Sequence, residues 1–198
     1  MRVHARMVTI ALALLPALAA AQHAGGAQPL AIKAPKEASQ FDFLVGQWDL
    51  VVKPKAMTLA QKVHGMPKLV GTWKAWRAFE GWGIEDDLRI VDASGNPMLL
   101  THYTRVYDAA AKHWSMSALD VFRQHFTASV AQWQNGEMLS TAEGIEPDGS
   151  PHLTRSHLHA ITANAFTYTQ DKSTDGGKTW IEGNLVIEAK RTAANAAR

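Results

Sequence analysis

The chain has 198 residues, of which 46% are apolar and 19% charged, and it contains no cysteine. This composition is typical of a globular domain and excludes a disulfide-bonded scaffold, so stability must come from a hydrophobic core. The formal net charge of +2 gives no indication of a nucleic-acid partner. No apolar run reaches the roughly 18 residues that a membrane-spanning helix needs.

Residues 1–21 have the pattern of a secretory signal peptide. Arg2 and Arg6 lie in a basic start, residues 7–18 are mostly apolar, and residues 19–21 are small, as a cleavage site requires. We therefore expect a periplasmic or secreted protein with no membrane span after cleavage. Loss of Arg2 and Arg6 would also remove the net positive charge.

The segment 40–192 is predicted to form one all-β domain, between a flexible leader (22–39) and a disordered tail (193–198). Apolar and polar residues alternate with a period close to two, and the links contain Gly, Asn, Asp and Pro. About ten strands without intervening helices predict a single antiparallel up-and-down barrel, because closure removes exposed edges. The expected strands are 44–52, 68–81, 83–92, 97–108, 113–122, 125–134, 138–146, 152–161, 166–173 and 179–190.

One short helix is predicted at residues 58–65. Thr58 is a suitable N-cap and Gly65 a suitable end, while Leu59 and Val63 have the spacing of one apolar face. The helix would lie between the first two strands, at a mouth of the barrel. It is either a lid or, as we expect, a simple packed connection.

Two motifs near the ends of the domain carry a family resemblance. The sequence FDFLVGQWD (41–49) contains Gly46-x-Trp48, and STDGGKTW (173–180) forms the last hairpin. Together they resemble an exported bacterial family that opens F-D-F-x-x-G-x-W-D and has no assigned function. That family is similar to the lipocalins of the calycin superfamily, so the resemblance implies a lipocalin-like barrel.

The G-x-W motif also has a physical interpretation. Gly46 allows the backbone to bend where the first strand enters the barrel floor, and Trp48 fills that floor with apolar surface. The lipocalin resemblance implies that an arginine near the end of the barrel stacks on this tryptophan. Arg191 is the candidate, although its place at the end of the last strand is equally typical of a solvated residue.

The pattern S-x-D-x-G-x-T-W at 173–180 resembles the Asp-box of sialidase-type β-propellers. Asp175 and Gly177 suit a tight turn, and Trp180 can pack over the hairpin. A propeller needs four or more blades of four strands each, which about ten strands cannot supply. We therefore interpret the motif as a structural hairpin, and a glycosidase is not supported.

Several side chains are candidates for ligand binding. Arg155, His157 and His159 share one face of a strand by alternation. They form either a polar patch inside the barrel or a solvated face. His157 and His159 could also bind a metal or haem, with His102 or His125 as a third ligand. The predicted ligand-binding residues are Trp73, Trp114, His102, Arg155, His157 and His159.

No catalytic motif occurs in the sequence. The carboxylates Glu85 and Asp87 share one face of a strand and Asp86 the other, which we interpret as a solvated strand start. We expect no catalytic residue and no cofactor, and an enzyme is not favoured. The sequence favours an exported barrel that binds a small apolar or amphipathic molecule. The alternatives are a haem or metal barrel and a structural or interaction protein of the cell envelope.

Overall fold

The computed structural model describes residues 33–146 and 148–192. The predicted signal peptide, the predicted leader up to residue 32 and the predicted tail lie outside the described residues. At the end of the predicted leader, Lys36–Ser39 form a 3-10 helix (η1) that buries Ala38. Within the described part, no helix is long and apolar enough to cross a membrane.

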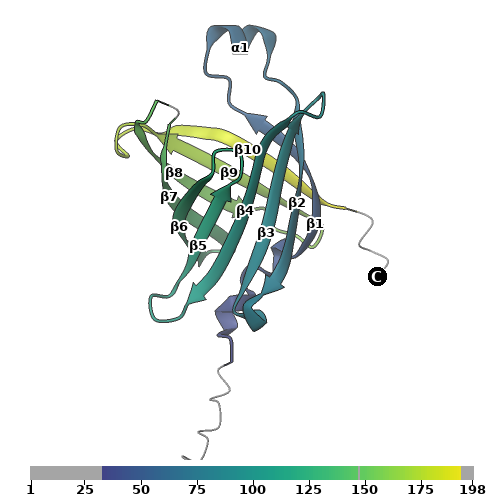
Figure 1. Ribbon diagram of the computed structural model, residues 1–198, viewed down its shortest axis with the longest axis vertical. Coiled ribbons are helices and arrows are strands. Elements are labelled where there is room, and N and C mark those ends of the chain that lie inside the picture. The colour runs from purple at the N-terminus through teal and green to yellow at the C-terminus, as the bar shows by residue number, and fades with distance from the viewer. Residues whose placement is uncertain (1–32, 147, 193–198) are drawn as a thin grey trace, which may run out of the picture. The chain divides into compact units, whose positions relative to one another are not determined.

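Ten strands form one closed antiparallel barrel, which confirms the predicted fold class (Figure 1). Each strand pairs with its neighbours in sequence, and the first strand pairs with the last. The strands are β1 (Gly46–Pro54), β2 (Leu69–Ala78), β3 (Gly83–Asp92), β4 (Pro97–Asp108), β5 (His113–Asp120), β6 (His125–Gln134), β7 (Glu137–Ile145), β8 (Pro151–His159), β9 (Ala165–Ser173) and β10 (Ile181–Arg191).

The alternating pattern decides which side chains face the interior. In β1, Trp48, Leu50 and Val52 are buried, whereas the residues between them are exposed. The same alternation brings Leu88 and Ile187 into the core from β3 and β10. A slip of one residue would turn each apolar face to water, so the pattern also fixes the register.

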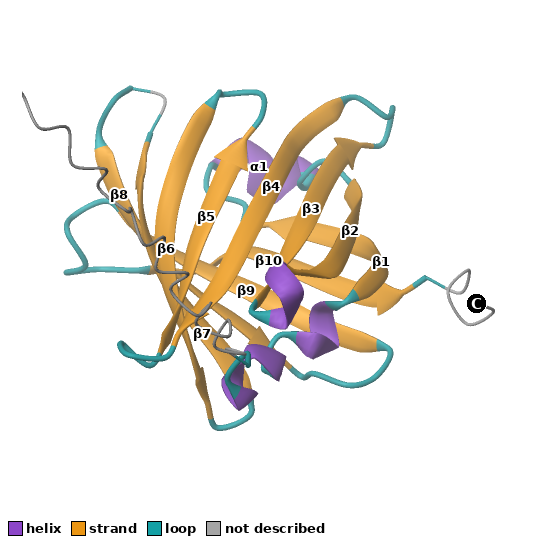
Figure 2. Ribbon diagram, turned by 60° about the horizontal axis from the view of Figure 1, so that its bottom comes forward, coloured by secondary structure: helices purple, strands orange, loops and turns teal. Residues whose placement is uncertain are grey.

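The N-terminal segment closes one end of the barrel, which we call the floor. The 3-10 helices η1 and η2 (Asp42–Leu44) gather at this end, near η3 (Phe79–Gly81) (Figure 2). Phe41 and Leu44 are fully buried there. The indole Nε1 of Trp48 donates a hydrogen bond of 2.7 Å to the carbonyl of Leu44. This bond connects the start of β1 to the N-terminal segment that closes the floor, which we call the plug.

The stacking of Arg191 on Trp48, implied by the lipocalin resemblance, is present. The guanidinium lies 4.1 Å from the Trp48 ring centroid. Gly46 has φ +126°, and a Cβ at this position would lie 2.3 Å from Arg191 Nη1. Glycine is therefore required twice, once for the backbone conformation and once for the close approach of the arginine.

The opposite end, which we call the open end, carries the only α-helix among the described residues, α1 (Leu59–His64). Thr58 caps α1 in a capping box with Gln61, as the sequence predicts. The packed connection that we expected is not formed, because no residue of α1 is buried. Leu59 and Val63 are 78% and 70% exposed, and the helix stands beyond the barrel end (Figure 1).

Candidate functional site

The barrel interior holds a cavity of about 740 Å³ that is lined by residues from nine of its ten strands. The cavity extends from Phe41 and Trp73 near the floor to Arg123 and Glu146 at the open end. Its size falls within the range of pockets that take small organic ligands. The interior is thus a ligand-sized space rather than a filled core.

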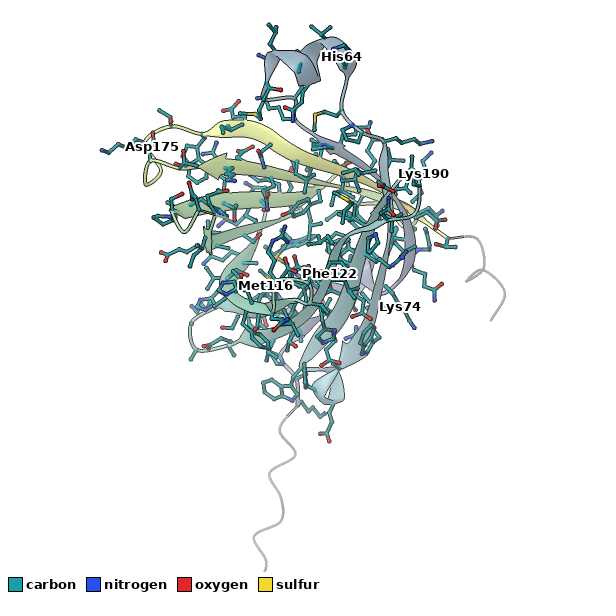
Figure 3. The ribbon with its side chains drawn as sticks, turned by 45° about the horizontal axis from the view of Figure 1, so that its top comes forward. His64, Lys74, Met116, Phe122, Asp175 and Lys190 are labelled. Atoms are coloured by element: carbon teal, nitrogen blue, oxygen red, sulfur yellow. The ribbon has the colours of Figure 1, made fainter. Side chains whose placement is uncertain are left out.

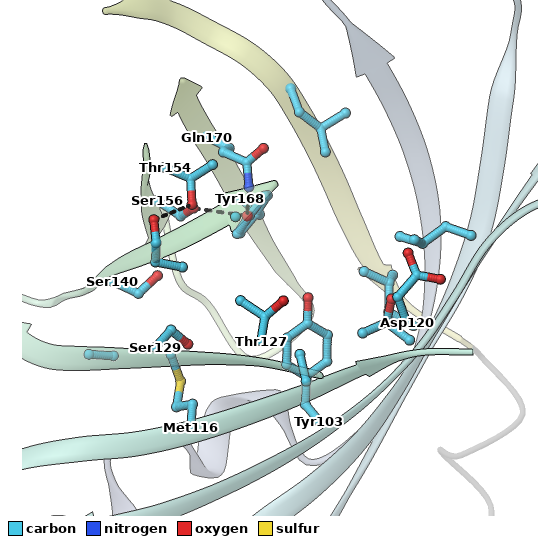
Figure 4. A pocket seen from close by; sticks show the side chains of 18 of the residues that line it. Tyr103, Met116, Asp120, Thr127, Ser129, Ser140, Thr154, Ser156, Tyr168 and Gln170 are labelled. Carbon is cyan, nitrogen blue, oxygen red and sulfur yellow. Dashed lines mark hydrogen bonds between the residues drawn. The ribbon is translucent and has the colours of Figure 1, made fainter. Parts of the chain in front are cut away.

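The lining has two chemically different sides. The side formed by β3, β10 and the start of β4 is apolar, and the side formed by β6 to β9 carries hydroxyl and amide groups that point inward (Figure 4). The apolar set is Leu88, Ile90, Leu99, Leu185 and Ile187, and the polar set is Thr127, Ser129, Ser140, Thr154, Ser156, Tyr168 and Gln170. Such a lining suits a molecule with one apolar and one polar part.

The polar side is organised around the hydroxyl of Tyr168. This oxygen accepts a hydrogen bond of 2.8 Å from Gln170 Nε2 and lies 2.9 Å from the Ser156 hydroxyl. Burial raises the pKa of Tyr168, although the hydrogen bonds from Ser156 and Gln170 act in the opposite direction. The hydroxyl therefore stays protonated and serves as a neutral hydrogen-bonding group.

A buried ion pair lies near the floor of the cavity. Arg105 donates to Asp86 through Nε at 2.6 Å and through Nη2 at 2.9 Å, and Trp73 Nε1 donates to the same carboxylate at 2.7 Å. Asp86 is fully buried and Arg105 is 4% exposed. Burial disfavours the charged guanidinium, but the charge and hydrogen bonds of Asp86 outweigh it and raise the pKa of Arg105.

Two aromatic rings lie close to this guanidinium. The Arg105 carbon Cζ lies 4.5 Å from the Tyr103 ring centroid and 5.1 Å from that of Phe41. Tyr103 lines the cavity, and its hydroxyl points into it (Figure 4). Because burial raises the pKa of Tyr103, this group can donate or accept a hydrogen bond but does not act as a base at neutral pH.

The two predicted aromatic ligand residues have different positions. Trp73 lines the cavity. Trp114 instead belongs to the floor, where it is fully buried, packs edge-on against Phe41 at 4.8 Å and donates to Gln40 Oε1 at 3.0 Å. Its burial behind Phe41 separates it from the lining.

His102 lies on the outer face of β4, so it does not line the cavity. Its Nδ1 is 2.8 Å from Asp87 Oδ1, and its Nε2 is 4.0 Å from Glu85 Oε1. Glu85 and Asp87 therefore lie on the same face of β3, as predicted. His102 joins them from β4, a contact that the sequence did not indicate because the residues are far apart in the chain. Trp76 donates to Glu85 from the same face at 3.1 Å.

Arg155 also lies on the outer face, because the inward residues of β8 are the even-numbered ones. It donates to Asp171 at 2.7 Å and its guanidinium stacks 4.4 Å from the Trp180 ring centroid. Burial alone would raise the pKa of Asp171, but the hydrogen bonds from Gly183 and Arg155 lower it overall. Arg155 therefore braces the last hairpin, and it does not form an interior patch.

His157 and His159 follow Arg155 on this outer face. His157 Nδ1 lies 3.5 Å from Glu137 Oε2, and His159 Nε2 lies 2.9 Å from the Thr169 hydroxyl. Across residues 33–146 and 148–192, no group of three or more His, Cys, Asp or Glu side chains is placed to hold a metal ion. The two candidate third ligands lie on other strands, His102 on the outer face of β4 and His125 at the start of β6.

The S-x-D-x-G-x-T-W motif forms the β9–β10 hairpin, with Asp175 at its tip (Figure 3). Asp175 accepts hydrogen bonds from the backbone and side chain of Thr179 at 2.9 and 2.7 Å and from Ser173 at 2.8 Å. These bonds lower the pKa of Asp175 to about 2. Gly177 has φ +87°, which explains the glycine at this turn position.

Sequence reasoning missed the polar centre of the cavity. Asp86 was interpreted as solvated, although it alternates with Ile84, Leu88 and Ile90 and therefore shares their inward face. A carboxylate on an apolar face indicates a buried partner, which is the signal that could have identified it. Its partner Arg105 comes from the next strand, and only the barrel register pairs Ile84 with Arg105.

No family model matches the chain, and no curated protein sequence matches it. Among solved structures, one described as "Structure of EF1p2_mFAP2b bound to DFHBI" aligns with 78% of this chain and 98% of that chain, at 9% sequence identity and a TM-score of 0.38. Similarity at this level carries no argument about function. The barrel is established by its own strand ladders, and the family resemblance rests on residues 41–49 and 173–180.

Proposed function

We propose that this chain is an exported, calycin-like barrel protein, periplasmic or secreted, that binds a small amphipathic molecule in its interior. The observation that supports the proposal best is the cavity of about 740 Å³ with one apolar side and one hydroxyl-rich side. A barrel without a ligand to bind would have a larger free energy of unfolding if larger side chains filled that space.

The polar groups suggest what the ligand carries. Tyr168, Ser156 and Gln170 present neutral donors and acceptors, and Tyr103 adds a further hydroxyl. The buried charge of Arg105 is matched by Asp86, so the floor offers no unpaired charge to attract an ion. The arrangement therefore suits a ligand whose polar end forms hydrogen bonds and whose remainder is hydrocarbon.

A pair of neighbouring substitutions tests this function. Ala118 lines the cavity, whereas Ser117, the preceding residue of β5, faces solvent. We expect Ala118→Phe to weaken binding of fatty acids or similar amphiphiles by about tenfold or more, because the ring occupies ligand space. Ser117→Phe adds the same ring outside and should leave the dissociation constant unchanged.

The measurement is intrinsic tryptophan fluorescence during titration with a panel of fatty acids, fatty alcohols and isoprenoids, since Trp73 lines the cavity. Saturable quenching in the wild type that is lost only in Ala118→Phe supports interior binding. No response to any member of the panel, confirmed by native mass spectrometry, would rule the proposal out.

A further inference from the structure

The barrel wall is incomplete between β6 and β7 at the open end. The ladder between these strands runs from Gln134↔Glu137 to Ser129↔Ala142 and stops there. Both strands continue beyond that point, to His125 on β6 and to Ile145 on β7, each still paired with its other neighbour. We call the space between residues 125–128 and 143–145 the β6–β7 opening.

A hollow of about 1180 Å³ passes through this opening. It shares inward-facing residues with the interior cavity, among them Ser129, Ala142 and Thr154, and it also has outward-facing walls. The interior and the outer surface are therefore continuous at this place. At one lip the His152 ring lies against the backbone of Gly144, since a Cβ there would lie 2.5 Å from His152 Nε2.

Outside the opening, the hollow is bordered by apolar side chains, which we call the outer groove: Phe126, Val130, Ile145, Leu153 and Trp180. Phe126 is 68% exposed, Ile145 62% and Val130 44%. The β9–β10 hairpin forms its far wall through Thr174, Gly176 and Trp180. Large apolar side chains gathered beside a passage to the interior indicate a binding surface rather than a random exposure.

We propose that the ligand is a single-chain amphiphile whose polar end binds at the Ser156–Tyr168–Gln170 cluster and whose hydrocarbon tail leaves through the β6–β7 opening to lie in the outer groove. This proposal rests on the interior binding proposed above and names the class of molecule. A space between two adjacent strands is long and narrow, so it suits one flexible chain better than a fused ring system. Because the cavity and the outer groove are continuous, the polar end can lie among hydroxyl and amide groups while the tail lies among apolar side chains.

The first test uses stearic acids that carry a quenching nitroxide either beside the carboxylate or at the chain terminus. Trp180 borders the outer groove, whereas Trp73 lines the interior. We expect the terminal label to quench the fluorescence of Trp180. The quenching by this label should therefore be smaller in Trp180→Phe than in the wild type. If only the label beside the carboxylate quenches Trp180, or if neither does, the proposed tail path is wrong.

The second test compares two valines of equal exposure. Val130 in the outer groove is 44% exposed, and Val51 on the outer face of β1 is 45% exposed. Val130→Glu should weaken octadecanoate binding by about tenfold, because a charge replaces apolar contact with the tail. It should weaken octanoate binding much less, since the shorter chain has less hydrocarbon to lie in the groove, and Val51→Glu should alter neither.

The outcomes separate the two proposals. If no amphiphile of either length binds the wild type, interior binding fails and the tail path fails with it. If octanoate and octadecanoate bind equally and Val130→Glu affects neither, interior binding stands and the tail path alone is overturned.

Discussion

Trp48 and Arg191 join the first and last strands of the barrel at its seam. They are directly opposed in the β1–β10 ladder, and the guanidinium of Arg191 lies 4.1 Å from the Trp48 ring centroid. Arg191 also donates to the carbonyls of Val45 at 2.9 Å and Ala163 at 2.7 Å. One side chain therefore connects the plug, the seam and the turn before β9.

Arg191→Ala should lower the free energy of unfolding by about 2 kcal/mol or more, because it removes a cation–π contact and several charge-assisted hydrogen bonds. Urea unfolding followed by circular dichroism measures the change. Arg89→Ala, at an exposed position of β3, is the control and should have little effect. An equal loss in both variants would contradict the role of Arg191 in the seam.

Gly46→Ala should destabilise the barrel by about 1–3 kcal/mol, because φ +126° is strained for any residue with a Cβ. The new methyl group would also displace the Arg191 guanidinium. In the Arg191→Ala background only the backbone strain remains, so the same glycine change should cost less there. Additive costs in the double-mutant cycle would show that the two residues are not coupled.

Asp86→Ala should destabilise the protein by about 3–5 kcal/mol, because it leaves the Arg105 charge buried without a partner. The double variant Asp86→Leu/Arg105→Met should recover most of that loss, since no buried charge remains. Thermal and urea unfolding of the single and double variants measure the coupling. A double variant as unstable as Asp86→Ala would show that the pair contributes more than mutual neutralisation.

The β9–β10 hairpin should lose stability in acid. The pKa of Asp175 is about 2 in the folded chain, below its ordinary value of 3.8. A lowered pKa stabilises the fold fully above the ordinary value, and this contribution disappears as the pH falls from 3.8 toward 2. The difference in unfolding free energy between the wild type and Asp175→Asn should shrink over this interval. A difference that stays constant with pH would contradict the assignment.

Much of the fold was accessible from local sequence signals. Alternation of apolar residues located the strands, and turn residues located the links between them. Thr58 and Gly65 located α1. These signals are readable because each depends on residues close together in the chain. The exposure of Leu59 and Val63 was not accessible, since it depends on how far α1 stands from the barrel.

Less of the candidate site than of the fold could be predicted from the sequence. Alternation alone shows that Arg155, His157 and His159 share a face, but it cannot say which face is inside, and the structure places them outside. On β8 the inward residues include both the polar Ser156 and the apolar Leu158, so the inward face does not stand out as apolar. The ambiguity arises because a barrel that holds a polar-lined cavity lacks the contrast between apolar inside and polar outside.

The sequence by itself determined the class of the domain, the hairpin at 173–180 and the identity of the floor residues Gly46 and Trp48, because short-range patterns and turn chemistry encode them. Only the tertiary structure decided which residues form the site. Asp86 and Arg105 meet because the β3–β4 register places them together. The β6–β7 opening exists because the β6–β7 ladder ends at Ser129↔Ala142, while the ladders on either side continue. Such features depend on pairings between strands, which no local pattern records.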